Sequence, residues 1–180
     1  IETGEVMIAR ANAHVKSPCR FMLVAAANPC KCGYLPDPAR ACARVPACGE
    51  DYLGRISGPL MDRFDLRVDV PPVSYSDLNL PANGDTSAEV AARVAAARAL
   101  QSTRYAQHDG ISANADAAGD AEARDLLLRA AERFCLSARG YHRVMRVART
   151  IADLEGAAEV RRPHMAEAIS FRLPDPAARR

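Results

Sequence analysis

An unbroken apolar run at 21–27 constrains the fold of this chain more than any other feature. The run does not alternate with polar residues, which is typical of a strand that is buried on both faces of a parallel sheet. It ends at Asn28, at the carboxyl end of the expected strand, which is where ligands gather in open α/β sheets. The alternative is that Asn28 and Pro29 form a turn that only ends the strand. A second strand is predicted at 66–70, where apolar and charged residues alternate with a period of two. These two strands predict an α/β fold.

The second half of the chain predicts helices instead. Prolines and turn-forming residues at 71–87 indicate a linker, so we expect one domain at 1–70 and a second at 88–175. Helices are predicted over 89–107 and 122–134, and a third begins after Ser137 as its cap and ends at Gly156. Pro163 opens a fourth helix. The fold class is therefore the C-terminal part of a parallel-sheet domain followed by an all-helical domain.

The third helix has one apolar and one basic side. The apolar residues recur at intervals of three and four and predict the buried face; they are Tyr141, Val144, Met145, Ala148, Ile151 and Ala152. The basic residues are expected at the surface, where they could face a nucleotide, a neighbouring subunit or DNA; they are Arg139, His142, Arg143, Arg146 and Arg149. Of these we single out Arg139, at the first turn, as functional.

Arg63 lies between two acidic residues, directly before the predicted strand at 66–70. A short helix that carries residues 59–61 would end near Asp62 and place Arg63 at a helix–strand junction. A guanidinium presented from such a junction is well shaped for a bidentate contact with phosphate. The alternative is a local ion pair with Asp62 or Asp65.

Four of the six cysteines fall in one short loop after Asn28. Cys30, Cys32, Cys42 and Cys48 could supply the four thiolates of a structural zinc site. Their spacing is irregular, and reduced thiols without metal remain the alternative. The other two, Cys19 and Cys135, are expected to be ordinary buried thiols.

Residues 5–16 predict a β-hairpin, because apolar residues alternate on both sides of a turn near Asn12. Its basic residues are Arg10, His14 and Lys16. Solvated charges on an ordinary hairpin are the simplest interpretation of these three residues.

Composition excludes several classes of protein. The net charge of +2 is too small to indicate nucleic-acid binding from overall balance, so any basic surface must be local. No apolar run approaches the roughly 20 residues of a membrane span, and no secretory signal is present, so we expect a cytoplasmic protein without a membrane partner. The four histidines are not paired as metal ligands, and no serine lies in a nucleophile elbow.

Four motifs carry a resemblance to a known family: GEVMIARANAHV, LVAAANPCKCGY, RISGPLMDRFDL and LSARGYHRVMRVARTIADLEGA. In this order, the chain resembles the C-terminal half of the magnesium-chelatase-like AAA+ ATPases, in particular the ComM/YifB family. The resemblance implies that Asn28 is the sensor 1 residue and that Arg63 is the arginine finger of a neighbouring subunit's site. It also implies that Arg139 is sensor 2, which reaches the nucleotide of its own subunit, and that Arg55 faces phosphate.

The same resemblance implies partners and cofactors. It implies a homo-oligomeric ring, most simply a hexamer, that uses ATP and Mg²⁺ to drive DNA branch migration in recombination and natural transformation. The hairpin would contact DNA through Arg10, His14 and Lys16. The resemblance also favours a structural Zn²⁺ at the cysteine loop. The cysteine loop favours this function over a chelatase-type subunit that loads metal into a porphyrin, because the chelatase subunits lack such a loop. A third alternative is a non-catalytic interaction fragment.

Two motifs are absent from the sequence. GxxxxGK(S/T), the loop that holds the β and γ phosphates, does not occur, and neither does the Walker B segment that the resemblance places before Glu2. We therefore expect this chain to be a fragment that does not hydrolyse ATP by itself.

Overall fold

The computed structural model describes residues 4–10, 13–19, 21–35, 37, 39–81, 84–107, 117 and 119–172. The chain divides into two compact units at Arg55 and Ile56, and each is described by itself. The predicted linker at 71–87 lies within the second unit, and the domain boundaries expected from the sequence stay a prediction.

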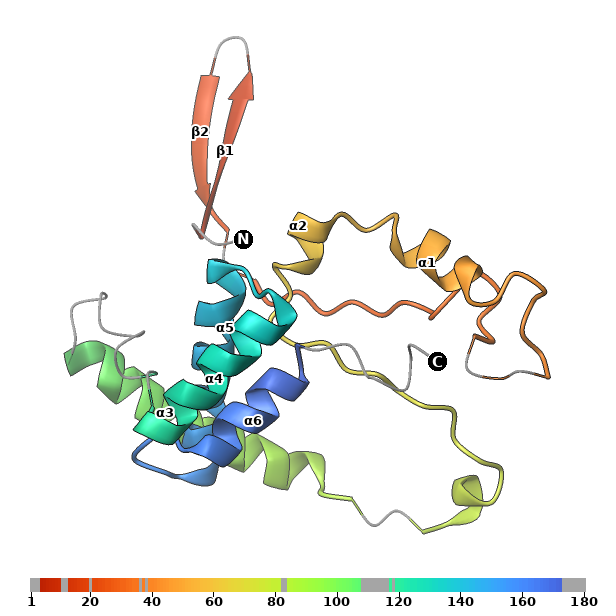
Figure 1. Ribbon diagram of the computed structural model, residues 1–180. Helices are drawn as coiled ribbons and strands as arrows, with labels where there is room; N and C mark the ends of the chain where they lie inside the picture. The colour runs from red at the N-terminus through yellow and green to blue at the C-terminus, as the bar shows by residue number, and fades with distance from the viewer. Residues whose placement is uncertain are drawn as a thin grey trace. The chain divides into compact units, whose positions relative to one another are not determined.

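The first unit begins with the predicted hairpin. Strands β1 (Glu5–Arg10) and β2 (Ala13–Pro18) pair antiparallel, with Ile8 opposite Val15 (Figure 1). Residues 11 and 12, where the sequence predicts the turn, lie outside the described residues. Both Ile8 and Val15 are about half exposed, so this hairpin has no apolar core of its own among the described residues.

The predicted strand at 21–27 is not formed. Residues 21–28 have no regular secondary structure and are exposed, with 87% of Met22 and 80% of Val24 accessible. The physical reason is that a strand needs a neighbour to satisfy its backbone groups and to cover its faces. In the part of the chain that the structure describes, β1 and β2 pair with each other and leave no strand beside 21–27. The unit continues through α1 (Ala47–Leu53).

The second unit begins with α2 (Gly58–Met61), the short helix expected before Arg63. Ser57 caps its start by accepting a hydrogen bond from the Leu60 amide, and Asp62 is its C-cap residue. The prediction of a strand at 66–70 is wrong for the same reason as the first. No described strand lies beside these residues, and they have no regular secondary structure. A short 3-10 helix, η1 (Asp77–Asn79), follows.

Four longer helices complete this unit: α3 (Ser87–Gln107), α4 (Ala121–Phe134), α5 (Ala138–Glu155) and α6 (Arg162–Ser170). The predicted caps of α5 are confirmed, since Ser137 accepts from the Gly140 amide and Gly156 is left-handed. Helix α3 begins two residues earlier than predicted. Thr86 and Glu89 form a capping box there, in which each side chain accepts from the other's backbone N–H.

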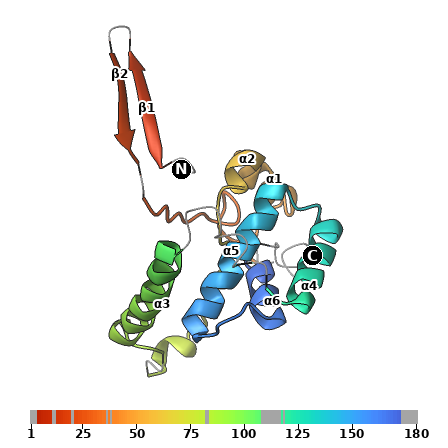
Figure 2. The ribbon, with the colours of Figure 1, turned by 90° about the vertical axis from the view of Figure 1, so that its left-hand side faces the viewer.

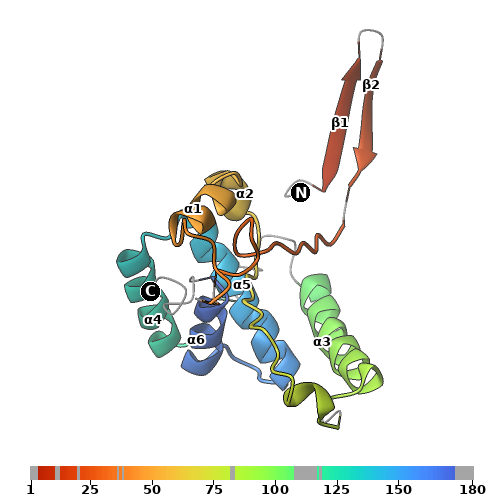
Figure 3. The same ribbon diagram turned by 90° about the vertical axis from the view of Figure 1, so that its right-hand side faces the viewer.

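The core of the second unit lies where α4, α5 and α6 meet. Helix α6 packs against both α4 and α5, and Figures 2 and 3 show it between them from opposite sides. Leu127, Val144 and Met165 fill the interior and are at most 1% exposed. Helix α3 packs on α5 and buries Ala97 there. No described helix is both long and apolar enough to cross a membrane.

Candidate functional site

The turn at 62–65 follows α2 and carries Arg63. Asp62 accepts a hydrogen bond from the Ser137 hydroxyl at 2.6 Å and forms an ion pair with Arg172. The hydrogen bond from Ser137, together with the nearby charges of Arg172 and Arg139, holds the pKa of the Asp62 carboxyl below its ordinary value. Asp62 therefore stays ionised at neutral pH and ties the turn to the start of α5.

Both carboxylates that flank Arg63 are occupied by other arginines. Asp62 pairs with Arg172 and Asp65 pairs with Arg143. The Arg63 guanidinium instead donates to the Pro59 carbonyl at 3.1 Å. The local ion pair considered from the sequence is therefore not found among the described residues. Arg63 is half-buried and keeps donor groups that this single bond does not use.

Arg143 and Arg172 are the functional candidates that sequence reasoning missed. Arg143 was assigned to the exposed basic side of the third helix, but it is 4% exposed and donates to the Arg63 carbonyl at 2.7 Å. Arg172 is 6% exposed and donates to the Phe64 carbonyl at 3.0 Å. Their partners lie more than 70 residues away in the sequence, so no local pattern could have indicated them.

Arg149 was also predicted to lie on the exposed basic side of the third helix, and this prediction is wrong. It is buried and donates to the carbonyls of Ala157 and Ala158 as well as to Asp153. The signal for this one was present in the sequence, because Arg149 and Asp153 stand four residues apart on one helix.

A glycine makes room for Arg172. A Cβ atom added to Gly140 would lie 3.0 Å from Nε and 3.1 Å from Nη2 of Arg172. Gly140 is buried in the first turn of α5, directly after Arg139. Because glycine has no side chain, the guanidinium of Arg172 can pass close to position 140 on its way to the turn at 62–65.

The other predicted nucleotide-facing residues are exposed. Arg139 lies on the first turn of α5, near enough for its charge to act on Asp62. The second unit therefore brings Arg63 and Arg139 to the same end of α5. Asn28 and Arg55 belong to the first unit, where Asn28 follows the unpaired segment and Arg55 follows α1.

The hairpin does not bring its three basic residues together on one face. Side chains of directly paired residues share a face, and the register pairs Ala9 with His14 and Met7 with Lys16. His14 and Lys16 therefore lie on one face, and Arg10 on the other. Lys16 also forms an ion pair with Glu5.

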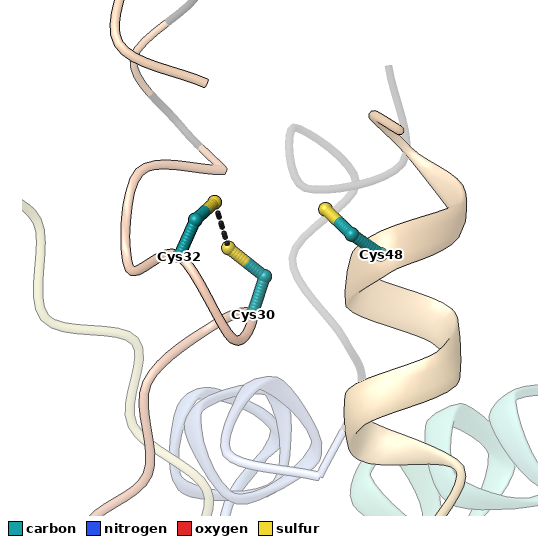
Figure 4. A group of neighbouring side chains, drawn as sticks. All are labelled: Cys30, Cys32 and Cys48. Carbon is teal, nitrogen blue, oxygen red and sulfur yellow. Dashed lines mark hydrogen bonds between the residues drawn. The ribbon is translucent and has the colours of Figure 1, made fainter. Parts of the chain in front are cut away.

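The structure brings the predicted thiol ligands together. The Sγ atoms of Cys30, Cys32 and Cys48 lie within 4.8 Å of one another. Figure 4 shows Cys30 and Cys32 on one loop and Cys48 on α1, with its thiol directed toward theirs. Three of the four predicted ligands form this group; Cys42 lies outside it, but near enough to affect the pKa values of Cys32 and Cys48. Cys135, in contrast, is exposed at the end of α4, so its predicted burial is wrong.

The thiols of the cluster differ in how readily they lose a proton, which a thiol must do to bind a metal cation. Hydrogen bonds from Cys30 and from the backbone of Tyr34 and Cys42 lower the pKa of Cys32 to about 6. Burial, together with the neighbouring thiols Cys42 and Cys30, raises the pKa of Cys48 to about 12. Four sulfurs around zinc at about 2.3 Å would lie about 3.8 Å apart, and the three clustered sulfurs lie within 4.8 Å of one another, so small side-chain movements would give that spacing. Such a site has no open position for water and would be structural.

Comparison with known families gives two matches that together cover nearly the whole chain. Residues 1–78 match the model for magnesium chelatase, subunit ChlI, and residues 84–172 match the model for magnesium chelatase, subunit ChlI C-terminal. The chain belongs to the magnesium-chelatase family. The resemblance inferred from the four sequence motifs is thus confirmed, and the helices α3 to α6 form the C-terminal domain of this family.

Individual relatives align over almost all of the chain. The competence protein ComM of Haemophilus influenzae is 38% identical over 177 residues, which are 96% of this chain and 34% of ComM. The YifB proteins of Salmonella typhimurium and Escherichia coli are 35% and 36% identical over 97% of the chain, which corresponds to 35% of each relative. The chain spans about a third of the length of these relatives.

Proposed function

We propose that this chain is the sensor, finger and lid part of a ring-forming AAA+ ATPase of the ComM type, whose ATP cycle drives branch migration of DNA. The observation that carries the proposal is the turn at 62–65. Its two carboxylates are paired with Arg143 and Arg172, so Arg63 is left without a carboxylate partner among the described residues. A guanidinium in this situation suits a phosphate supplied by another subunit.

The proposal accounts for the two exposed apolar segments. In a longer protein of the relatives' length, residues 21–27 and 66–70 would pair with further strands of a parallel sheet, and Asn28 would lie at its carboxyl edge as sensor 1. The Walker A and Walker B groups that hold ATP and Mg²⁺ would come from outside this chain. This chain by itself would then not hydrolyse ATP, and a cytoplasmic location belongs to the same proposal.

ATP turnover by the protein at the relatives' full length tests the proposal. It should be measured with and without forked and four-way DNA. We expect DNA to stimulate turnover. Turnover that is indifferent to DNA would contradict the motor function and would favour a chelatase-type subunit. No turnover at all would favour a non-catalytic interaction fragment.

The role of Arg63 in a neighbour's site is tested in mixed rings. Arg63→Ala should abolish turnover, because a finger contributes about 10³-fold or more to the rate. Subunits that carry Arg63→Ala should regain turnover when mixed with subunits that have an intact finger but a defective Walker A motif. Mixed rings that stay inactive would refute the trans role.

Arg139 is proposed to act on the nucleotide of its own subunit. Arg139→Ala should therefore impair a subunit in a way that a neighbour cannot repair. Rescue by the Walker-defective subunits would contradict this role. It would indicate that Arg139 and Arg63 serve the same neighbouring site, as their common position at the start of α5 allows.

The hairpin is proposed to touch the DNA backbone through Arg10, His14 and Lys16. Since these residues occupy both faces, a strand of DNA could contact the hairpin from either side. Replacing each by alanine should weaken DNA binding at low salt without altering turnover in the absence of DNA. Val73, which is exposed in the second unit, gives a control substitution to alanine that should leave DNA binding unchanged.

The cysteine cluster is proposed to hold one structural Zn²⁺ through Cys30, Cys32, Cys42 and Cys48. The convergence of the Cys30, Cys32 and Cys48 thiols, the nearness of Cys42 and the low pKa of Cys32 support this proposal. The described residues of the loop at 29–46 form no helix or strand, and a metal would stabilise the loop in place of an apolar core.

A chelatase-type function is the second candidate, and the match to magnesium chelatase subunit ChlI favours it. In that function the ATPase would act on a partner that inserts metal into a porphyrin. The two candidates are separated by the substrate that stimulates turnover. DNA stimulation supports the first, and stimulation by a porphyrin-binding partner protein supports the second.

A further inference from the structure

The turn that carries Arg63 is attached to the helical unit at several points. Ser137 donates to the Asp62 carboxylate at 2.6 Å, and Arg172 donates to the Phe64 carbonyl at 3.0 Å. Arg143 donates to the carbonyl of Arg63 itself at 2.7 Å and pairs with Asp65. Every residue from 62 to 65 therefore makes a bond to α5 or to the end of α6.

The attachment continues beyond the turn. The Arg67 amide donates to the Phe171 carbonyl at 2.8 Å, and its guanidinium donates to the Met61 carbonyl at 3.0 Å. The side chains of Arg143 and Arg172 are each 5% exposed. Charge-assisted bonds from buried groups such as these are strong and poorly screened, so they fix backbone geometry more firmly than surface pairs.

We infer that Arg143 and Arg172 are positioning residues for Arg63, and that the finger belongs mechanically to the helical unit. This inference rests on the proposed function of Arg63. The two arginines touch the backbone of the turn and its carboxylates, and neither is the group that would contact phosphate. When the helices move, the turn moves with them, so the position of the helical unit decides where the finger points.

The energetic consequence follows from the geometry of phosphoryl transfer. A displacement of about 1 Å in a positioned group costs about 100-fold in rate. Loss of Arg143 or Arg172 should therefore lower turnover by about 10-fold to 100-fold. This is less than the loss of about 1000-fold or more that is expected when Arg63 is removed.

Mixed rings distinguish positioning of the finger from general damage. Arg143→Met and Arg172→Met should each lower turnover in uniform rings of the full-length protein. Because their own nucleotide sites stay intact, they should regain turnover when mixed with Walker-defective subunits, as Arg63→Ala does. Damage to a subunit's own fold would not be repaired by a neighbour.

Matched variants keep the test independent of folding. Arg146→Met removes an exposed arginine from the same helix and should change nothing. Asp65→Asn weakens the ion pair with Arg143. The Asp65 side chain is 57% exposed, so this variant should fold normally. It should lose less turnover than Arg143→Met and be rescued in the same mixed rings. Arg143→Lys should recover part of the turnover because it keeps the charge but not the forked geometry.

Hydrogen exchange gives a second readout on the same proteins. The amides of 62–67 should exchange faster in Arg143→Met and Arg172→Met, while the amides of α4 keep their protection. Rescue of Arg63→Ala without rescue of Arg143→Met and Arg172→Met would overturn the inference and leave the proposed function standing. If Arg63→Ala itself is not rescued, the trans role fails. In that case hydrogen exchange at 62–67 tests by itself whether Arg143 and Arg172 hold the turn. Faster exchange in Arg143→Met and Arg172→Met supports this role, and unchanged exchange overturns it.

Discussion

Asp153 should be a sensitive position for the stability of the helical unit. Its side chain is 1% exposed and lies where α3 meets α5. It accepts hydrogen bonds from Arg104 at 3.0 Å, from Arg149 at 3.0 Å and from Gln101 at 3.4 Å. Although burial alone would raise the pKa of Asp153, the hydrogen bond from Arg104 and the charges of both arginines lower it. The carboxylate is therefore ionised in the folded chain.

Replacing Asp153 by asparagine keeps the size of the side chain and removes its charge. Arg149, whose side chain is 8% exposed, then remains buried without a countercharge, although it still donates to two carbonyls. Breaking a buried pair in this way costs about 3–5 kcal/mol, and we expect about 3 kcal/mol because the carbonyl bonds persist. Arg104→Met should cost about 1–2 kcal/mol, since Arg104 is more exposed and Asp153 keeps Arg149.

Urea denaturation followed by far-ultraviolet circular dichroism measures these costs. Asp125→Asn is the matched control, because Asp125 pairs with Arg129 on the surface of α4 and should lose less than about 1 kcal/mol. The double variant Asp153→Asn with Arg149→Met should be less destabilised than the sum of the single variants. The reasoning is refuted if Asp153→Asn costs no more than Asp125→Asn.

Three further predictions concern backbone, metal and acid. Gly119→Ala should destabilise the helical unit by about 1 kcal/mol more than Gly156→Ala in urea denaturation, because both glycines have positive φ but only at Gly119 would a Cβ lie 2.9 Å from a backbone oxygen; equal costs would contradict this. Native mass spectrometry should show one zinc that is lost in Cys42→Ser and kept in Cys135→Ser, and a wild-type chain without metal would end the zinc proposal. The pKa of Asp62 is lowered from 3.8, so its contribution to stability is complete above that value and is lost as the pH falls through the lowered pKa. Acid unfolding of Asp62→Asn should lack this loss, and identical acid profiles would refute it.

The sequence predicted those parts of the fold that depend on neighbouring residues. The limits of α5 follow from two residues. Ser137 caps its start by accepting a hydrogen bond from the amide three residues later, and Gly156 ends it in a left-handed conformation. Three of the four predicted thiols lie together for a related reason, because Cys30 and Cys32 share one loop and Cys48 follows them closely in the sequence on α1.

The parts that failed depend on partners far away or absent. The apolar run at 21–27 was assigned as a buried strand, but burial requires strands that the described residues do not supply. Arg143 was assigned to the surface because helical periodicity places it away from the apolar face of α5. Its burial comes from the turn at 62–65, and periodicity within one helix contains no information about such a segment.

Gly140 has a consequence for the engineering of this domain. Glycine inside a helix costs about 0.5–1 kcal/mol relative to alanine, so position 140 would be an obvious choice for a stabilising substitution. An alanine there would press on Arg172, whose other side is held by Asp62 and Phe64. The gain in helix propensity would be offset by displacement of the arginine that fixes the finger turn. Positions 140 and 172 should therefore be varied together, because an alanine at 140 requires the Arg172 side chain to give way by a few tenths of an ångström, whereas a shorter residue at 172 would not need to move.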